Sequence, residues 1–237
     1  MIDKSFIEKV WDDIRFGFFN NVDGDILCQS ECEYKLEGEI YEGSVLKERF
    51  HSALPPRVVI SKEQVYMEGP QRSTNDWNDE WFRGMEVRIP EEEETEDLIG
   101  KRIPMAGCYL PKTHTVVLFP VCLKDQNEET VVHELFHAFH HSVMYDSPTW
   151  LSRNSKRVKI VKESLADYYA YLWCKRHGNY AGADRLFNKW YRYRKTDWPY
   201  RYALYFLNNG NDEKFWNTLL NSAQSSPAEL VKQIKKV

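Results

Sequence analysis

The sequence predicts an α+β fold in which short strands come first and helices dominate the second half of the chain. Two observations carry this prediction. Strand-like stretches broken by glycine and proline fill much of the first half, and apolar residues at helical spacing fill the second. The composition is that of a globular protein, with 42% hydrophobic and 29% charged residues. A chain of 237 residues is long enough for one large domain with a substantial core.

The first predicted element is a helix over residues 4–19, because apolar side chains recur there at helical spacing. From there to about residue 90 the pattern is short and strand-like, and residues 58–60 (Val-Val-Ile) form the clearest buried strand. An acidic run follows at residues 91–97. Such a run is typical of a solvated loop, and it is the best candidate for a boundary between residues 1–100 and residues 101–237.

The second part begins with strand-like residues 106–110 and 115–119, joined as a hairpin or through a bulged turn. Acidic and amide side chains at residues 125–128 then predict the start of a helix that runs to about Met144. Further helices are predicted over residues 162–176, 183–194, 200–207, 212–222 and 227–235. The sequence shows no internal repeat, so the order of strands before helices decides the fold class.

Charge and hydropathy exclude several classes of function. The 32 Lys and Arg residues against 36 Asp and Glu give a net charge of −4, so no strong basic field attracts nucleic acid. The longest apolar run, residues 116–123, is far shorter than the roughly 20 residues of a membrane span. The N-terminus lacks the pattern of a signal peptide, and five cysteines are too few for a disulfide framework. We therefore expect a cytoplasmic protein, unless a leader was removed, with no nucleic-acid or membrane partner.

One short motif indicates the chemistry. His133, Glu134 and His137 form the pattern H-E-x-x-H within a predicted helix. The two histidines are one helical turn apart, so both imidazoles lie on one face and can reach a single metal ion. Zinc accepts neutral imidazole nitrogen and, in catalytic sites, keeps one position open for water. Glu134 lies beside the metal position, where a carboxylate can deprotonate that water.

A third metal ligand is needed, and the next long helix supplies it. Glu163 follows His137 by 26 positions (163 − 137), which is enough for a loop and a returning helix. Asp167 lies one helical turn after Glu163 on the same face, where it can accept the spare N–H of a ligating histidine. Two antiparallel helices would thus present His133, His137 and Glu163 to one zinc ion.

At these residues the chain resembles the gluzincins, the thermolysin-like zinc metallopeptidases that combine H-E-x-x-H with a downstream E-x-x-x-D. The resemblance covers about residues 105–210 and implies a zincin-like fold, with the catalytic core in residues 101–237. Residues 1–100 are then either the upper wall of this core or a separate accessory region. The resemblance also implies a hydrolase that cleaves a peptide or protein substrate with zinc-activated water, with Glu134 as the general base.

The same resemblance implies two features of substrate binding. Gluzincins usually add a tyrosine or histidine that donates to the oxyanion, and Tyr200 and Tyr202 both lie in the corresponding region. Their spacing does not choose between them. The strand that precedes the active-site helix pairs with extended substrate in this family, a role that residues 107–110 or 115–119 would fill here.

Two alternatives share the metal site but differ in biology. The ImmA/IrrE-type regulatory proteases show H-E-x-x-H-x-x-L-H; His141 matches the last histidine, whereas His140 replaces the usual leucine. The second alternative is a non-catalytic, metal-bearing binding module that acts through the same cleft. A metzincin is excluded, because that pattern requires glycine and histidine where this chain has His140 and Val143. We expect both His140 and His141 to line the cleft or to face the helix C-terminus.

Overall fold

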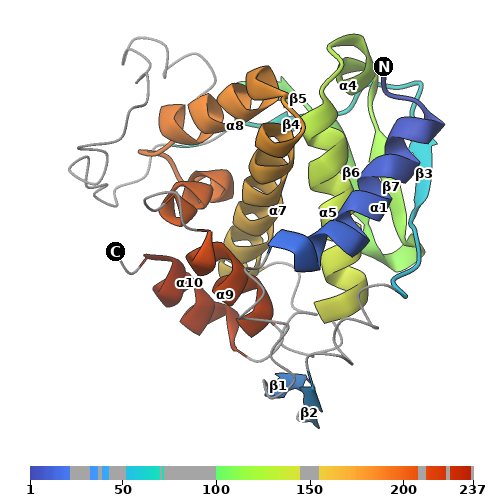
Figure 1. Ribbon diagram of the computed structural model, residues 1–237. Coiled ribbons are helices and arrows are strands. Elements are labelled where there is room, and N and C mark those ends of the chain that lie inside the picture. The colour runs from blue at the N-terminus through green and yellow to red at the C-terminus, as the bar shows by residue number, and fades with distance from the viewer. Residues whose placement is uncertain are drawn as a thin grey trace.

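The computed structural model describes the helices and strands around the predicted metal site. The described residues are 1–21, 33–36, 39–42, 52–69, 71, 100–144, 155–207, 212–222 and 225–235. They form an α+β protein, as predicted, with two long helices at the centre, a small sheet on one side and shorter helices on the other (Figure 1). The acidic run at residues 91–97, the predicted boundary, lies outside the described residues.

The main sheet contains the three strands that the sequence predicts. In spatial order they are β3 (Arg57–Ile60), β7 (Thr115–Leu118) and β6 (Gly107–Leu110). β6 and β7 are antiparallel, whereas β3 runs parallel to β7. Val116 and Leu118 of β7 are fully buried, since this face of the sheet rests on a central helix. The other described strands are the antiparallel pairs β1 (Glu33–Leu36) with β2 (Glu39–Glu42) and β4 (Tyr66–Glu68) with β5 (Arg102–Pro104).

The turn between β6 and β7 is fixed by side chains. It is the 3-10 helix η3 (Pro111–Thr113), followed by His114 in the left-handed region with a φ of 46°. Few residues other than glycine adopt this backbone without support. His114 is held at both ring nitrogens, because Nε2 lies 3.0 Å from the Leu54 carbonyl oxygen and Nδ1 lies 2.9 Å from the Tyr109 hydroxyl. The turn is therefore tied to the residues that lead into β3.

The two central helices are α5 (Glu128–Met144) and α7 (Lys156–Arg176), which lie side by side and run antiparallel (Figure 1). Phe136 of α5 and Tyr169 of α7 stack between them, with ring centroids 4.6 Å apart. α7 begins six positions before the predicted start at residue 162 (162 − 156). The prediction was too short because Val158 and Val161, three positions apart on one face, are also buried in the core.

The remaining described helices cover the outer sides of this pair. They are α1 (Lys4–Asn21), α4 (Pro120–Lys124), α8 (Tyr180–Arg192), η4 (Pro199–Phe206), α9 (Glu213–Asn221) and α10 (Pro227–Lys235). η4 is a 3-10 helix, which is tighter than the α-helix that the sequence predicts there. α4 was not predicted, because its residues continue an apolar, strand-like run. Pro120 at its first position favours a helix start at that point.

Within residues 1–100, α1 and β3 pack on the same core as the rest of the chain. Trp11 of α1 meets Phe139 of α5 edge to face, with ring centroids 6.4 Å apart. Asp13 accepts a hydrogen bond from Trp173 Nε1 at 3.2 Å and lies 3.1 Å from His177 Nε2. β3 adds a second connection, because it pairs with β7. None of the described helices is long and apolar enough to cross a membrane.

Candidate metal centre

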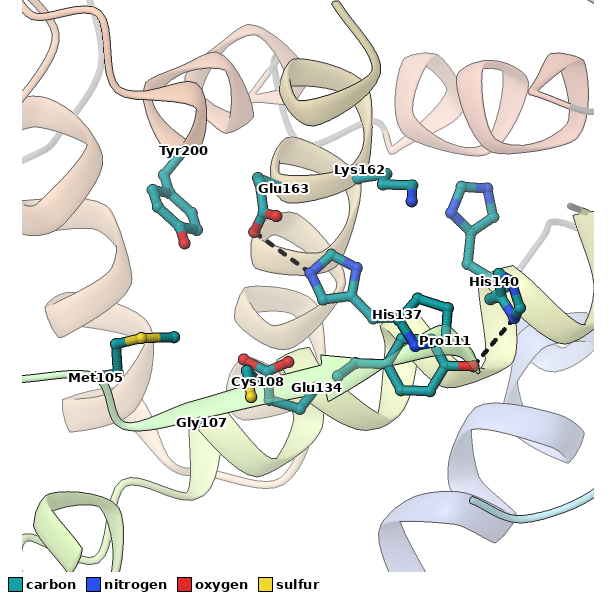
Figure 2. A pocket seen from close by; sticks show the side chains of 12 residues that line it. Met105, Gly107, Cys108, Pro111, Glu134, His137, His140, Lys162, Glu163 and Tyr200 are labelled. Carbon is teal, nitrogen blue, oxygen red and sulfur yellow. Dashed lines mark hydrogen bonds and ion pairs between the residues drawn. The ribbon is translucent and has the colours of Figure 1, made fainter. Parts of the chain in front are cut away.

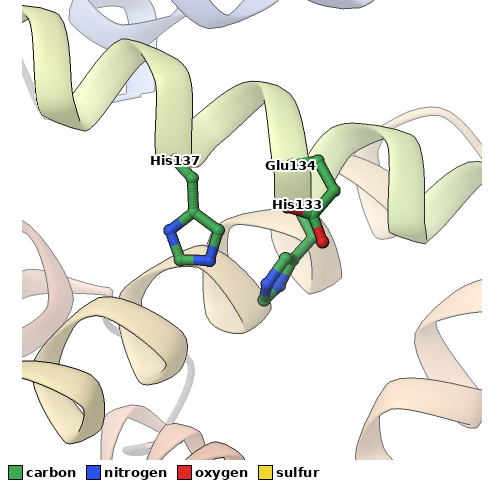
Figure 3. A group of neighbouring side chains, drawn as sticks. All are labelled: His133, Glu134 and His137. Carbon is green, nitrogen blue, oxygen red and sulfur yellow. The ribbon is translucent and has the colours of Figure 1, made fainter. Parts of the chain in front are cut away.

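His133 and His137 lie one turn apart on α5, and both side chains point toward α7 (Figure 3). Their rings pack edge to face with centroids 4.5 Å apart. Together with Glu134 they form a group whose possible ligand atoms all lie within 4.8 Å of one another. His133 and Glu134 are buried, and His137 is half-buried. The helical spacing of the motif therefore places the two imidazoles where one ion could contact both.

Glu163 on α7 adds a third donor. Its Oε2 lies 3.3 Å from His133 Nε2 and 3.3 Å from His137 Nε2 (Figure 2 shows the second contact). Donor atoms at about 2.0–2.1 Å from a tetrahedral zinc ion lie roughly 3.3–3.4 Å from one another. The two contacts of Glu163 Oε2 thus have the spacing expected between ligands of one metal ion. The structure brings together all three residues that the sequence predicts as ligands.

Asp167 lies one turn further along α7, next to His133. Its Oδ1 is 2.7 Å from His133 Nδ1, and neither atom has another hydrogen-bond partner among the described residues. Its Oδ2 lies 2.6 Å from Lys189 Nζ and accepts a hydrogen bond from Trp190 Nε1 at 2.7 Å. These contacts with His133, Lys189 and Trp190 fix the position of the carboxylate. It keeps the proton of His133 on Nδ1 and turns Nε2 toward the other two donors.

The charges of the site favour a cation. Burial alone would lower the pKa of His133, but Asp167, Glu163 and Glu134 outweigh burial and raise it to about 10. Burial alone would raise the pKa of Asp167, yet Lys189 and His133 hold it below its ordinary value. The pKa of Glu163 likewise lies well below its usual range, because His137 and His133 outweigh burial. Both carboxylates stay ionised, so a proton or a metal ion is stabilised at their centre.

Glu134 is placed to move a proton. It is buried between α5 and β6, and burial raises its pKa more than His133 and His137 lower it. A carboxylate with a raised pKa is a stronger base near neutral pH than an exposed one. Gly107 of β6 makes room for this side chain, since a Cβ at that position would lie 2.9 Å from Glu134 Cγ. The sequence placed Gly107 in a substrate-binding strand but gave no signal for this contact.

The two candidate tyrosines have different surroundings in the structure. Tyr200 lies at the site: its ring centroid is 6.0 Å from that of His133, and Lys189 Nζ lies 4.3 Å above it. Burial and the charges of the neighbouring carboxylates raise the pKa of Tyr200 well above its usual value, so the phenol remains a donor. Tyr202 lies in the core, 3% exposed, where it accepts a hydrogen bond from Arg201 at 3.1 Å. The structure therefore does not bring Tyr202 to the metal centre.

A cleft runs past two of the three donors, His137 and Glu163. One cavity lies over β6 and contains Glu134, His137, Glu163 and Tyr200 in its wall (Figure 2). A second cavity, with a volume of about 520 Å³, shares Glu163 and Tyr200 with the first and continues toward the start of α7. Within the described residues, β6 is an edge strand of the main sheet. The cleft thus has an open strand edge on one side and the candidate metal donors at its centre.

The backbone of β6 presents hydrogen-bonding groups along that edge. The Phe119 N–H donates to the Ala106 carbonyl oxygen, which makes these two residues a hydrogen-bonded pair. Pairing alternates along an antiparallel ladder, so Cys108 and Leu110 also bond to β7. The N–H and C=O groups of Gly107 and Tyr109 therefore point away from β7. They are the groups that an added strand would contact.

The histidines after the motif have separate surroundings. His140 is 1% exposed; its Nε2 lies 2.9 Å from Ser222 Oγ, and its ring stacks on Phe136. It is almost fully buried, yet it also lines the cavity over β6, as expected for both histidines (Figure 2). His141 lines the cleft too, and its Nδ1 lies 3.0 Å from the Tyr109 hydroxyl. That hydroxyl also contacts His114, so α5, β6 and the turn are joined by one chain of hydrogen bonds.

Sequence reasoning missed several residues of the cleft wall. Met105 and Lys162 line it, but neither belongs to a recognisable motif. Lys162 directly precedes Glu163, and burial lowers its pKa to about 8. Its position beside a predicted ligand was a signal that could have been used. Comparison with protein-family models, curated proteins and solved structures finds no match for this chain.

Proposed function

We propose that this protein is a zinc-dependent peptidase of the gluzincin type with a zincin-like catalytic core. One observation carries the proposal: Glu163 Oε2 lies 3.3 Å from both His133 Nε2 and His137 Nε2, beside a cleft that Glu134, His137 and Glu163 line. Two imidazoles and one carboxylate are a donor set that suits catalytic zinc. A zinc ion held there would act as a Lewis acid toward water and toward the substrate carbonyl.

The chain's own residues divide the remaining tasks. Glu134, whose pKa is raised by burial, accepts a proton from the attacking water and returns it to the leaving amine. Asp167 holds His133 in the tautomer that leaves Nε2 available to a metal. Tyr200 keeps its proton and can donate it in a hydrogen bond to the oxygen of the reacting carbonyl. The edge of β6 supplies backbone groups that match an extended peptide.

The decisive test is Glu134→Gln, which keeps the shape of the side chain but removes the base. We expect chelator-sensitive hydrolysis of an unfolded protein by the wild type and a loss of roughly 10²- to 10⁴-fold in the variant. Zinc content should stay the same, because Glu134 is not one of the three proposed ligands. Hydrolysis is followed by release of labelled peptides, and bound metal by elemental analysis.

Glu8→Gln is the matched control, since it makes the same chemical change at an exposed site on α1. It should retain the full rate. Undiminished activity in Glu134→Gln, or activity that survives complete removal of metal, would contradict the proposed mechanism.

A further inference from the structure

Three lysines follow one another at every third position of α7. Lys156 and Lys159 line the second cavity of the cleft, and Lys162 lines the first. Glu163 and Tyr200 lie in both cavities, so the lysines flank the candidate metal centre along one wall. We call Lys156, Lys159 and Lys162 the basic ridge. Figure 2 shows Lys162 beside Glu163 at the first cavity.

Besides Glu163, two acidic residues line the second cavity with the ridge. Asp197 lies 3.9 Å from Lys156, which compensates that lysine. Glu68, which also lines the second cavity, lies directly opposite Arg102 across β4 and β5. Lys159 is exposed and forms no ion pair with any residue that the structure describes. Apart from Glu163 and Glu134, the two cavities are lined by three lysines against two acidic residues, which leaves an excess of one positive charge on this side of the cleft.

The first turn of α7 also carries basic residues where acidic residues are usual. Acidic residues stabilise the first turn of an α-helix because they oppose its dipole, whereas basic residues there destabilise it. α7 begins with Lys156 and Arg157, has no acidic residue in its first turn, and receives no side-chain cap from Ser155. A sequence that breaks a local folding rule in a cleft wall indicates that the residues serve binding.

We propose that the cleft selects polypeptides that carry acidic side chains around the scissile bond, and that the basic ridge is the determinant of this specificity. The proposal rests on the peptidase function proposed above. From Lys156 to Lys162 the helix rises by about 9 Å, which corresponds to roughly three residues of an extended peptide. The ridge can therefore contact several side chains of one substrate.

The opposite wall of the cleft suits an acidic peptide better than it suits a polyanion with a phosphate backbone. The edge of β6 presents alternating N–H and C=O groups at Gly107 and Tyr109, which pair with a peptide backbone. A phosphate backbone has no N–H donors for the carbonyl groups of that edge. The whole chain carries a net charge of −4, so the cations that face the cleft are a local feature.

Binding tests the proposal without relying on turnover. Two fluorescent peptides of equal length, one rich in glutamate and one with lysine at the same positions, are titrated with the full-length Glu134→Gln protein. We expect the acidic peptide to bind more tightly and to lose affinity as salt is added. Lys159→Gln and Lys162→Gln should each weaken its binding roughly fivefold, which corresponds to about 1 kcal/mol.

Lys175→Gln is the control, because it removes the same charge near the other end of α7, where the lysine lies over the Tyr171 ring. It should leave binding unchanged. Equal binding of the two peptides, or an effect of Lys175→Gln as large as that of the ridge variants, overturns the proposal. So does a single-stranded oligonucleotide that displaces the acidic peptide at lower concentration than unlabelled acidic peptide. If the wild type hydrolyses both peptides at equal rates, the specificity is refuted and the peptidase function stands. If the acidic peptide binds selectively but the wild type hydrolyses neither peptide, the peptidase function is refuted and the binding preference stands.

Discussion

A proton and a metal ion compete for His133. Its folded pKa of about 10 lies above the ordinary value of 6.5, so the residue is protonated at neutral pH when no metal is bound. A metal ligand must be neutral at the coordinating nitrogen, so zinc binding should release this proton. The same shift stabilises the metal-free fold most fully below pH 6.5, and this contribution is lost as pH rises through about 10.

The first prediction is therefore that zinc affinity rises about tenfold per pH unit between pH 7 and 9 and levels off near pH 10. The measurement is competition with a chelator of known affinity at each pH. Asp167→Asn is the informative comparison, because it removes the group that contributes most to the raised pKa of His133. The slope should flatten in that variant and the affinity should fall by roughly 10- to 100-fold. A flat profile in the wild type would contradict the assignment of His133 as a ligand.

A second prediction concerns Glu163. Elemental analysis should find about one zinc per wild-type chain and far less in Glu163→Ala, because the three-donor set loses its carboxylate. Glu8→Ala, on the exposed face of α1, should retain the wild-type content. Full retention of zinc by Glu163→Ala would mean that another side chain completes the site. His141 would then be the first to examine, since it lines the same cavity.

At the scale of elements, local spacing predicted the metal donors but not what surrounds them. His133 and His137 are four positions apart, so they share one face of the helix. This relation holds wherever the segment is helical, whatever the rest of the fold. Tyr200 and Tyr202 lie two positions apart, so they point to different sides of any helix. Which tyrosine faces the cleft depends on how η4 is turned about its own axis relative to the helices that it contacts. Long-range packing sets this orientation, and the sequence alone does not predict it.

β6 gives a prediction that belongs to this scale. Gly107→Ala would place a Cβ 2.9 Å from Glu134 Cγ and 3.1 Å from Thr130 Cγ2, so the catalytic carboxylate must move. We expect the rate of peptide hydrolysis to fall roughly 10- to 100-fold with zinc content unchanged, because misplacement by less than an ångström weakens proton transfer. Leu110→Ala, in the same strand but exposed, should have little effect. An equally active Gly107→Ala protein would show that the close approach of β6 does not position Glu134.

At the scale of the whole molecule, the α+β class followed from the order of strands and helices, whereas the topology did not. β3 pairs in parallel with β7 across more than fifty intervening residues, and α1 packs on α5 across more than a hundred. Periodicity reports which face of an element is buried, but it does not report the partner of that face. The early start of α7 was missed for the same reason, because its first turns mix lysines with buried valines.

The metal centre joins the two helices on which this whole arrangement rests. His133 and His137 come from α5 and Glu163 from α7, so a bound ion would link the two central helices, which pack on each other. Zinc would bind only the folded chain, because the unfolded chain does not hold the donors together. At a free zinc concentration 100-fold above Kd, binding would stabilise the folded state by about 2.7 kcal/mol. For a chain of this length we expect the Tm to rise by about 5–10 °C when zinc is added to metal-free protein. Glu134→Gln should show the same rise, because it leaves the donors in place, and Glu163→Ala should show much less. A rise of equal size in Glu163→Ala, measured by differential scanning calorimetry, would place the stabilising ion elsewhere on the protein.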